Sequence, residues 1–187
     1  MIRRIFSVVV LLMLCAAISH AEAVTVVTGL DLNRYAGKWF EIARFPNRFQ
    51  KQCVGNVSAN YVKRADGDID VINRCINAAG VIEEAVGRAR VPSIETTAKL
   101  KVRFAPQWLT WLPMVWADYW VVDLSPDYTV AAVGDPTRKY LWILSRTPVI
   151  AEPLYHALMK RLVVQGYDTN NLVLTPQDVM KQSSASR

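Results

Sequence analysis

The feature that most constrains the fold is a succession of eight short strand-like runs joined by turns. They cover residues 37–45, 54–63, 69–76, 81–91, 98–104, 117–123, 129–134 and 140–145. Alternation is clearest in 98–104, where basic residues at 99, 101 and 103 alternate with apolar ones, which indicates a half-buried strand. Strands that follow one another in an antiparallel meander hide their edges best by closing into a barrel. The sequence therefore predicts an all-β fold, an eight-stranded antiparallel up-and-down β-barrel with room for one small ligand.

A helical pattern follows the last run. Residues 153–165 begin with a proline and are followed by Gly166, which are common start and stop signals of a helix. Five apolar residues recur at helical spacing and are expected to form one face: Leu154, Leu158, Met159, Leu162 and Val163. We expect this C-terminal α-helix to pack outside the barrel, with a short strand at 171–174 after it. Residues 24–176 are thus predicted to form one domain, and 177–187 a disordered tail.

The first 23 residues are predicted to be a secretory signal peptide. Two arginines precede an apolar run over residues 5–18, and small residues follow. The run is shorter than the roughly 20 residues that a membrane-spanning helix needs. We therefore expect export to the periplasm, with cleavage after Ala21 or Ala23. The alternative is an outer-membrane lipoprotein acylated at Cys15, which the bulky Leu14 before that cysteine disfavours.

The chain has a net charge of +6, and its basic residues are spread along the sequence. A positive charge favours anionic lipid head groups through long-range attraction, although an ordinary soluble surface accounts for it equally well. No basic stripe alternates with aromatic residues, and export separates a protein from DNA. Nucleic-acid binding is therefore not predicted.

Two motifs far apart in the sequence are expected to meet. Gly37-Lys38-Trp39 opens the first strand, and Arg146 follows the last one. A guanidinium group can lie on an indole ring, so Arg146 is expected to cover Trp39. These motifs and the residues around them resemble the lipocalin family, in particular the bacterial outer-membrane lipocalins and apolipoprotein D. The stretch 124–128 departs from the Thr-Asp-Tyr motif that lipocalins usually carry after the sixth strand.

The resemblance implies roles for several residues. Gly37, Trp39 and Arg146 would close one end of the barrel without touching the ligand. Three residues match positions that line the pocket of apolipoprotein D, and three more share a strand face with them because side chains alternate along a strand. The matching residues are Tyr61, Asn73 and Trp142, and the added ones are Val57, Ala59 and Val71.

Two cysteines remain after the predicted leader, Cys53 and Cys75. An even number in an oxidising compartment suggests a disulfide. Both lie at the same end of the hairpin formed by 54–63 and 69–76, but regular pairing leaves them several residues out of register. A disulfide therefore requires the loop before Cys53 to fold back. The alternative is a reduced thiol that acts as nucleophile, as in the lipocalin-type prostaglandin synthases.

Few residues are suited to other catalysis. His156 is the only histidine after the predicted leader, and it falls on the predicted outer helix. A Ser-His-Asp arrangement or a histidine-rich metal site would need it elsewhere. We predict no catalytic residues, no metal site and no cofactor.

The order of the strands gathers four connections at one end of the barrel. These are residues 46–52, 77–80, 105–116 and 135–139, of which 105–116 contains Trp108 and Trp111. This apolar loop is either a lid on the barrel or a contact with a membrane surface. We predict a protein that binds a fatty acid or lysophospholipid and stores or carries it in the bacterial cell envelope. A cysteine-dependent lipid-modifying enzyme and an envelope interaction protein that uses 105–116 are the alternatives, and a homodimer is left open.

Overall fold

The structure is a computed structural model, which describes residues 23–105 and 115–177. The predicted leader, Cys15, most of the predicted tail, and Trp108 and Trp111 lie outside the described residues. Among the described residues, eight strands follow the predicted runs and differ from them by one residue at some ends. They are β1 (Gly37–Arg44), β2 (Cys53–Lys63), β3 (Ile69–Asn77), β4 (Ile82–Arg90), β5 (Lys99–Arg103), β6 (Ala117–Leu124), β7 (Val130–Gly134) and β8 (Leu141–Ser145).

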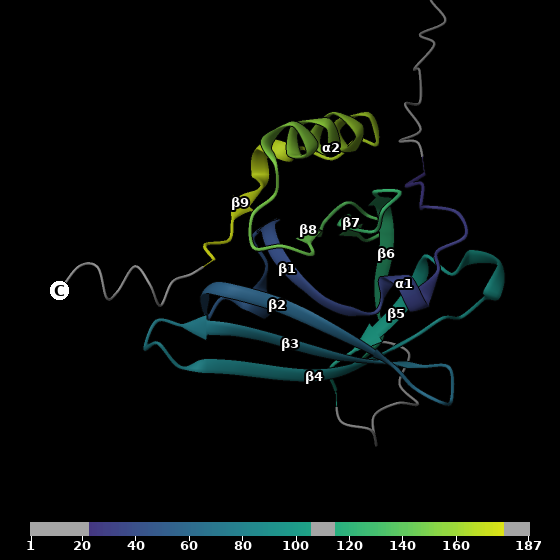
Figure 1. The fold of residues 1–187 in the computed structure, drawn as a ribbon, viewed down its shortest axis with the longest axis horizontal. Coiled ribbons are helices and arrows are strands. Elements are labelled where there is room, and N and C mark those ends of the chain that lie inside the picture. Colours follow the sequence, from purple (N-terminus) through teal and green to yellow (C-terminus); the bar gives the residue numbers. More distant parts are fainter. Residues whose placement is uncertain (1–22, 106–114, 178–187) are drawn as a thin grey trace, which may run out of the picture.

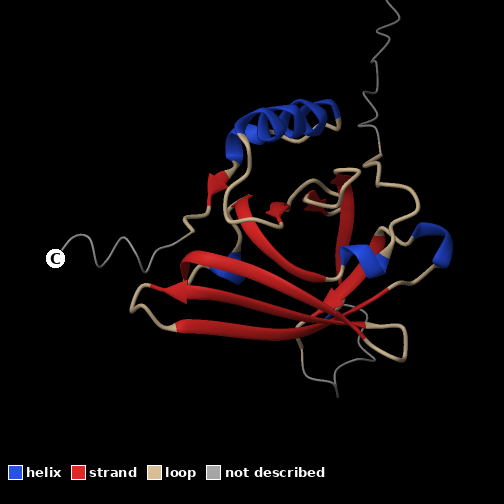
Figure 2. Ribbon diagram, viewed as in Figure 1, coloured by secondary structure: helices blue, strands red, loops and turns tan. Residues whose placement is uncertain are grey.

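The strands form one closed antiparallel barrel. Neighbours follow the chain order from β2 to β8, β8 pairs with β1, and β1 pairs with β2. Figure 2 shows the strands enclosing a common interior. The prediction of an eight-stranded up-and-down barrel is confirmed, and a ninth strand, β9 (Val173–Leu174), adds to the free part of β1.

Two α-helices and three short 3-10 helices complete the described fold. Helix α1 (Leu32–Tyr35) precedes β1, and Asp31 caps it by accepting from the backbone N–H groups of Asn33 and Arg34. Helix α2 (Glu152–Val164) follows β8. The 3-10 helices are η1 (Arg48–Gln50), η2 (Ile94–Thr96) and η5 (Thr169–Asn171).

Helix α2 lies outside the barrel beside β7 and β8, whereas β2, β3 and β4 form the far wall (Figure 1). Leu158 and Leu162 are fully buried against the outward side chains of Leu141 and Ile143. Arg161 fixes the helix further through a two-pronged ion pair with Asp123, at 2.6 and 2.9 Å. The buried apolar face of α2 is narrower than predicted, because Leu154 and Val163 are 53% and 55% exposed.

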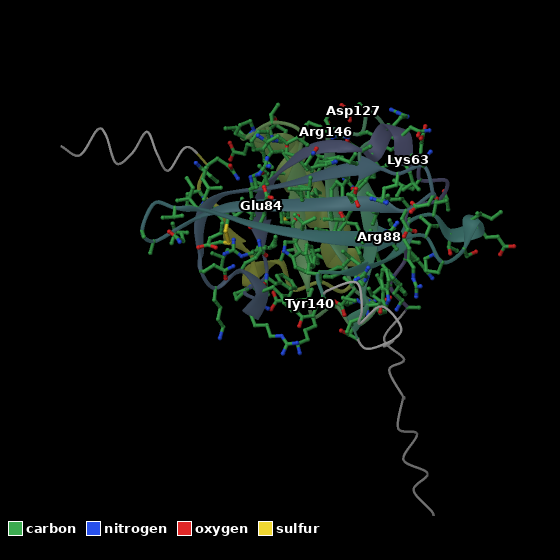
Figure 3. The ribbon with its side chains drawn as sticks, turned by 90° about the horizontal axis from the view of Figure 1, so that it is seen from below. Lys63, Glu84, Arg88, Asp127, Tyr140 and Arg146 are labelled. Carbon is green, nitrogen blue, oxygen red and sulfur yellow. A yellow bond between two sulfur atoms is a disulfide. The ribbon has the colours of Figure 1, made fainter. Side chains whose placement is uncertain are left out.

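The barrel has a closed and an open end. The turns after β2, β4 and β6 lie at the closed end, together with α1 and the end of β8. The connections 45–52, 78–81 and 135–140 lie at the open end, where β5 also ends and β6 begins. Tyr140 and Arg146 flank β8, and Figure 3 shows them on opposite sides of the barrel.

Candidate ligand-binding site

Trp39 and Arg146 meet at the closed end. The Trp39 ring is fully buried, and the guanidinium carbon of Arg146 lies 3.9 Å from its centroid. The indole N–H donates to the Tyr35 carbonyl at 2.8 Å. Arg146 donates to the carbonyls of Lys38 and Arg34 at 2.9 and 2.7 Å. One side chain therefore ties α1, β1 and β8 together over the ring.

Gly37 allows this arrangement through its backbone conformation. Its φ is +91°, which other residues rarely adopt, and a Cβ atom there would lie 3.4 Å from Arg146 Nη1. A side chain would thus combine backbone strain with contact against the guanidinium. The closed end therefore depends on glycine at this position.

Most of the six predicted ligand-binding residues lie on the inner wall. Tyr61 and Val71 are buried in the inner cluster, and Ala59 and Trp142 pack against it. Asn73 is opposite Ala59 across the β2–β3 ladder and shares its face. Val57 is buried, but it lies where β2 bulges and does not belong to the inner cluster.

Asn73 is a polar residue on this apolar wall. Its Oδ1 atom is buried and accepts no hydrogen bond from the described residues. A buried acceptor without a donor is costly in a native fold. This atom marks a place where the hydroxyl of a bound ligand or an ordered water can donate.

Three tyrosines meet inside the barrel near its closed end. Tyr119 Oη lies 2.7 Å from Tyr35 Oη and 2.8 Å from Tyr61 Oη. Burial raises the pKa of Tyr61 to about 12 and the pKa values of Tyr35 and Tyr119 well above 10. The hydroxyls therefore remain protonated at physiological pH. Of the three, only Tyr61 was predicted from the sequence, because Tyr35 and Tyr119 come from segments distant from it.

We expect alkaline pH to destabilise the fold through these tyrosines. Between about pH 10 and 12 the unfolded chain loses phenolic protons that the folded barrel keeps, since burial raises the pKa of Tyr61 to about 12. The contribution of the protonated tyrosines to stability is fully present below pH 10 and is lost as pH rises through the folded pKa. For each tyrosine, the free energy of unfolding falls by about 1.4 kcal/mol per pH unit in this range. Urea unfolding across this range measures the slope, and Tyr119→Phe should make it shallower. An unchanged slope would contradict the prediction.

A polar network that the sequence did not reveal crosses the inner wall nearer the open end. Glu41 is 3% exposed, and its carboxylate accepts from Arg44 Nη1 at 2.6 Å and from the Thr175 hydroxyl. Its second oxygen accepts from Gln50 Nε2 at 2.7 Å. Gln50 in turn accepts from the indole N–H of Trp142 at 2.8 Å. The network therefore fixes both the loop after β1 and the ring of Trp142.

The C-terminal segment fills a gap beside this network. After β9, the N–H of Thr175 donates to the Ile42 carbonyl at 2.9 Å, and the N–H of Asn56 donates to the Pro176 carbonyl at 2.8 Å. Gln177 donates to backbone carbonyls of both β1 and β2. Residues 173–177 thus bridge β1 and β2 where these two strands separate.

A groove of about 320 Å³ lies at the open end, between the connections 45–52 and 135–140. It is lined by Pro46, Asn47, Arg48, Lys139 and Tyr140. Within the described part of the chain, neither Arg48 nor Lys139 forms an ion pair with a carboxylate. The Tyr140 ring stacks on Trp142 with centroids 5.8 Å apart. The groove is therefore a cationic site next to the inner wall.

Cys53 and Cys75 form a disulfide with their Cα atoms 5.6 Å apart, and Figure 3 shows the bond in yellow. The predicted pairing is confirmed, but the expected folding back of the loop is wrong. Cys53 belongs to β2, and two register shifts in the β2–β3 ladder place it opposite Asn77. Asn56, with φ of +50°, lies within the shifted part. The bulged strand, rather than the loop, brings the sulfurs together.

Catalytic groups are sparse in the described residues. Both candidate thiols are consumed by the disulfide, which leaves the cysteine-dependent enzyme without its nucleophile. His156 lies on α2 with its side chain 64% exposed, beside Glu152. The described residues contain no group of three or more potential metal ligands of the His, Cys, Asp and Glu types. Among these residues, no helix has the length and apolar character to cross a membrane.

A closed eight-stranded barrel with an apolar interior, a sealed end and an outer C-terminal helix is an architecture suited to binding one small ligand. A family model described as a lipocalin-like domain matches residues 30–177, and the chain belongs to the lipocalin family. Insecticyanin of the tobacco hornworm Manduca sexta has the same fold, with a TM-score of 0.67, 19% identity and coverage of 86% of this chain and 88% of that one.

Sequence relatives agree with the predicted resemblance. Temperature-induced lipocalin-1 of Arabidopsis thaliana is 42% identical over 85% of this chain and 86% of its own length. Outer membrane lipoprotein Blc of Escherichia coli is 34% identical over 89% of this chain and 90% of its own length. Apolipoprotein D of Mus musculus is 31% identical over 79% of this chain and 77% of its own length. The predicted similarity to bacterial outer-membrane lipocalins and apolipoprotein D is therefore confirmed.

Proposed function

We propose that this lipocalin binds a single-chain anionic lipid, a fatty acid or a lysophospholipid, and stores or carries it in the bacterial cell envelope. The observation that carries the proposal is the cationic groove at the open end beside an apolar inner wall. The hydrocarbon chain lies along Ala59, Val71 and Trp142, where burial of apolar surface favours it. The acidic head group lies in the groove, attracted by Arg48 and Lys139.

The position of Trp142 supports this assignment. Its ring is packed against the inner cluster, and its N–H is held by Gln50. A ring fixed by a hydrogen bond and by the stacked Tyr140 offers a rigid apolar surface to a chain. It also lies between the wall and the groove, as a ligand with both an apolar and a charged part requires.

The first experiment tests for lipid and for the charge of its head group. Mass spectrometry of the protein from periplasmic extracts should reveal a co-purified fatty acid or lysophospholipid. The double charge reversal Arg48→Glu/Lys139→Glu should weaken fatty-acid binding about tenfold or more, which corresponds to about 1.4 kcal/mol. Binding of the matching fatty alcohol should change little, because the alcohol carries no charge. Tryptophan emission measures both affinities.

Matched variants separate the groove from the overall charge and from the wall. The double reversal Lys63→Glu/Lys160→Glu changes the net charge equally but lies away from the groove, and it should leave both affinities unchanged. Trp142→Leu, once shown to fold, should weaken the acid and the alcohol alike. Equal binding of both ligands by the Arg48/Lys139 variant and the wild type would rule out the head-group site, and a Trp142→Leu protein of unchanged affinity would rule out the wall.

Envelope location is proposed on the leader sequence and on similarity to Blc, which is by name an outer membrane lipoprotein. Cleavage after Ala21 or Ala23 would release the protein into the periplasm. The alternative is anchoring through acylated Cys15. The mass of the mature protein distinguishes the two, because an acylated N-terminal cysteine adds fatty chains and begins the chain at residue 15.

A further inference from the structure

The hydroxyls of Tyr35, Tyr61 and Tyr119 leave one hydrogen-bond donor without a partner among themselves. Three hydroxyls carry three protons, but the hydrogen-bonded series from Tyr35 through Tyr119 to Tyr61 contains two hydrogen bonds. Whichever way the protons point, one O–H remains unused by the other two hydroxyls. Protons cannot leave at physiological pH, since burial raises the pKa of each tyrosine. A buried donor without an acceptor is costly, so an acceptor is expected beside it.

The cavity next to these hydroxyls is large enough for one acceptor atom. It measures about 10 Å³ and is lined by Tyr35, Tyr61, Ile69, Val71, Ala89, Leu100 and Tyr119. Such a volume is close to the smallest that holds one water molecule. A hydroxyl or carbonyl oxygen is of comparable size. All lining residues other than the tyrosines are aliphatic, so within the cavity wall the phenol groups are the polar partners.

The proposed path of the ligand leads to this cavity. Ala59 pairs with Asn73, and the next inward pair of the same ladder is Tyr61 with Val71. These last two residues also line the cavity. A chain that enters at the open end and follows the inner wall therefore reaches the tyrosines with its far end.

We propose that Tyr35, Tyr61 and Tyr119 form a donor site for an oxygen atom at the buried end of the ligand. The ligand class is then an acyl chain that carries a hydroxyl or carbonyl group at or near its last carbon. This inference rests on the proposed function, in which the acidic head group stays at the open end. It adds a second polar contact at the opposite end of the chain.

The test compares fatty acids with their ω-hydroxy derivatives over chain lengths of about 10 to 18 carbons. An apolar pocket rejects an added hydroxyl by about a hundredfold. With a donor site, the ω-hydroxy acid should bind the wild type as tightly as the parent acid, or more tightly, at the length that reaches the tyrosines. Tyr119→Phe breaks the hydroxyl chain and should weaken the ω-hydroxy acid at least about tenfold relative to its parent. Tyr155→Phe, on α2 outside the barrel, should not change the ratio.

The outcomes separate this site from the function on which it rests. If the ω-hydroxy acid binds the wild type about a hundredfold more weakly at every length, the cavity holds water alone and the inference is wrong. This ratio decides the question even when Tyr119→Phe does not fold. The site is also overturned if a folded Tyr119→Phe protein binds the ω-hydroxy acid and its parent with the same affinity ratio as the wild type. Normal binding of the parent acids would then leave the proposed function intact, whereas no binding of any fatty acid or lysophospholipid would overturn both.

Discussion

Replacing Trp39 with alanine is expected to lower the free energy of unfolding by about 3 to 5 kcal/mol, the usual cost of truncating a core tryptophan. The ring is fully buried and lies under the guanidinium group of Arg146. Its removal leaves a cavity at the closed end that the surrounding strands cannot fill without distorting the barrel. It also leaves the Tyr35 carbonyl without its indole donor. Urea unfolding followed by circular dichroism measures the loss.

Further variants locate the source of that loss. Trp39→Phe keeps an apolar ring but removes the N–H, so it should cost clearly less than alanine. A double-mutant cycle of Trp39→Leu, which removes the ring, with Arg146→Ala should give a coupling energy of about 0.5 to 2 kcal/mol, the range expected for a guanidinium on a ring. A Trp39→Ala protein within about 1 kcal/mol of the wild type would show that the closed end does not depend on this ring.

The barrel itself was predictable because its signals are local. Alternation with a period of two and the turns between runs lie within ten or so residues of each other. Because side chains alternate along a strand, Leu141 and Ile143 of β8 face the outer helix while Trp142 faces inward, as the two clusters show. The meeting of Trp39 with Arg146 needed more, since they are joined by no local pattern, and the motif resemblance supplied it.

The register of the β2–β3 hairpin was not predictable from its turn. Counting cross-strand pairs from the turn assumes that each residue of β2 is opposite one residue of β3. Two shifts, between Cys53 and Gly55 and between Gly55 and Ser58, break that assumption. A bulge depends on what the strand must fit beside, here the C-terminal residues that donate to and accept from β1 and β2. Such a tertiary cause leaves little trace in the hairpin sequence.

The polar parts of the site were missed for a similar reason. Tyr35 and Tyr119 are 84 residues apart, and Glu41 and Thr175 are 134 residues apart. Glu41 was not among the residues predicted to line the site. One signal was nevertheless available. Glu41 follows Trp39 by two residues on the same strand, so a carboxylate was bound to face the interior and to need partners there.

Replacing Glu41 with alanine is expected to cost about 3 to 5 kcal/mol, because loss of one partner of a buried ion pair leaves an uncompensated charge. Arg44, whose side chain is 15% exposed, would remain on the inner wall without its carboxylate. Gln50 and Thr175 would lose an acceptor at the same time. Both the loop after β1 and the segment after β9 are held by these bonds. Hydrogen exchange should therefore quicken in 46–52 and in 173–177 before it does in the rest of the barrel.

Glu84 provides a matched control for this loss. It also pairs with an arginine, Arg74, at 2.7 Å, but the two side chains are 42% and 56% exposed. Exposed pairs contribute little, so Glu84→Ala should cost no more than about 1 kcal/mol. Glu41→Gln keeps the volume and part of the hydrogen bonding, and should fall between the two. Equal losses for Glu41→Ala and Glu84→Ala would mean that the inner network does not hold these segments, and that Trp142 is positioned by packing alone.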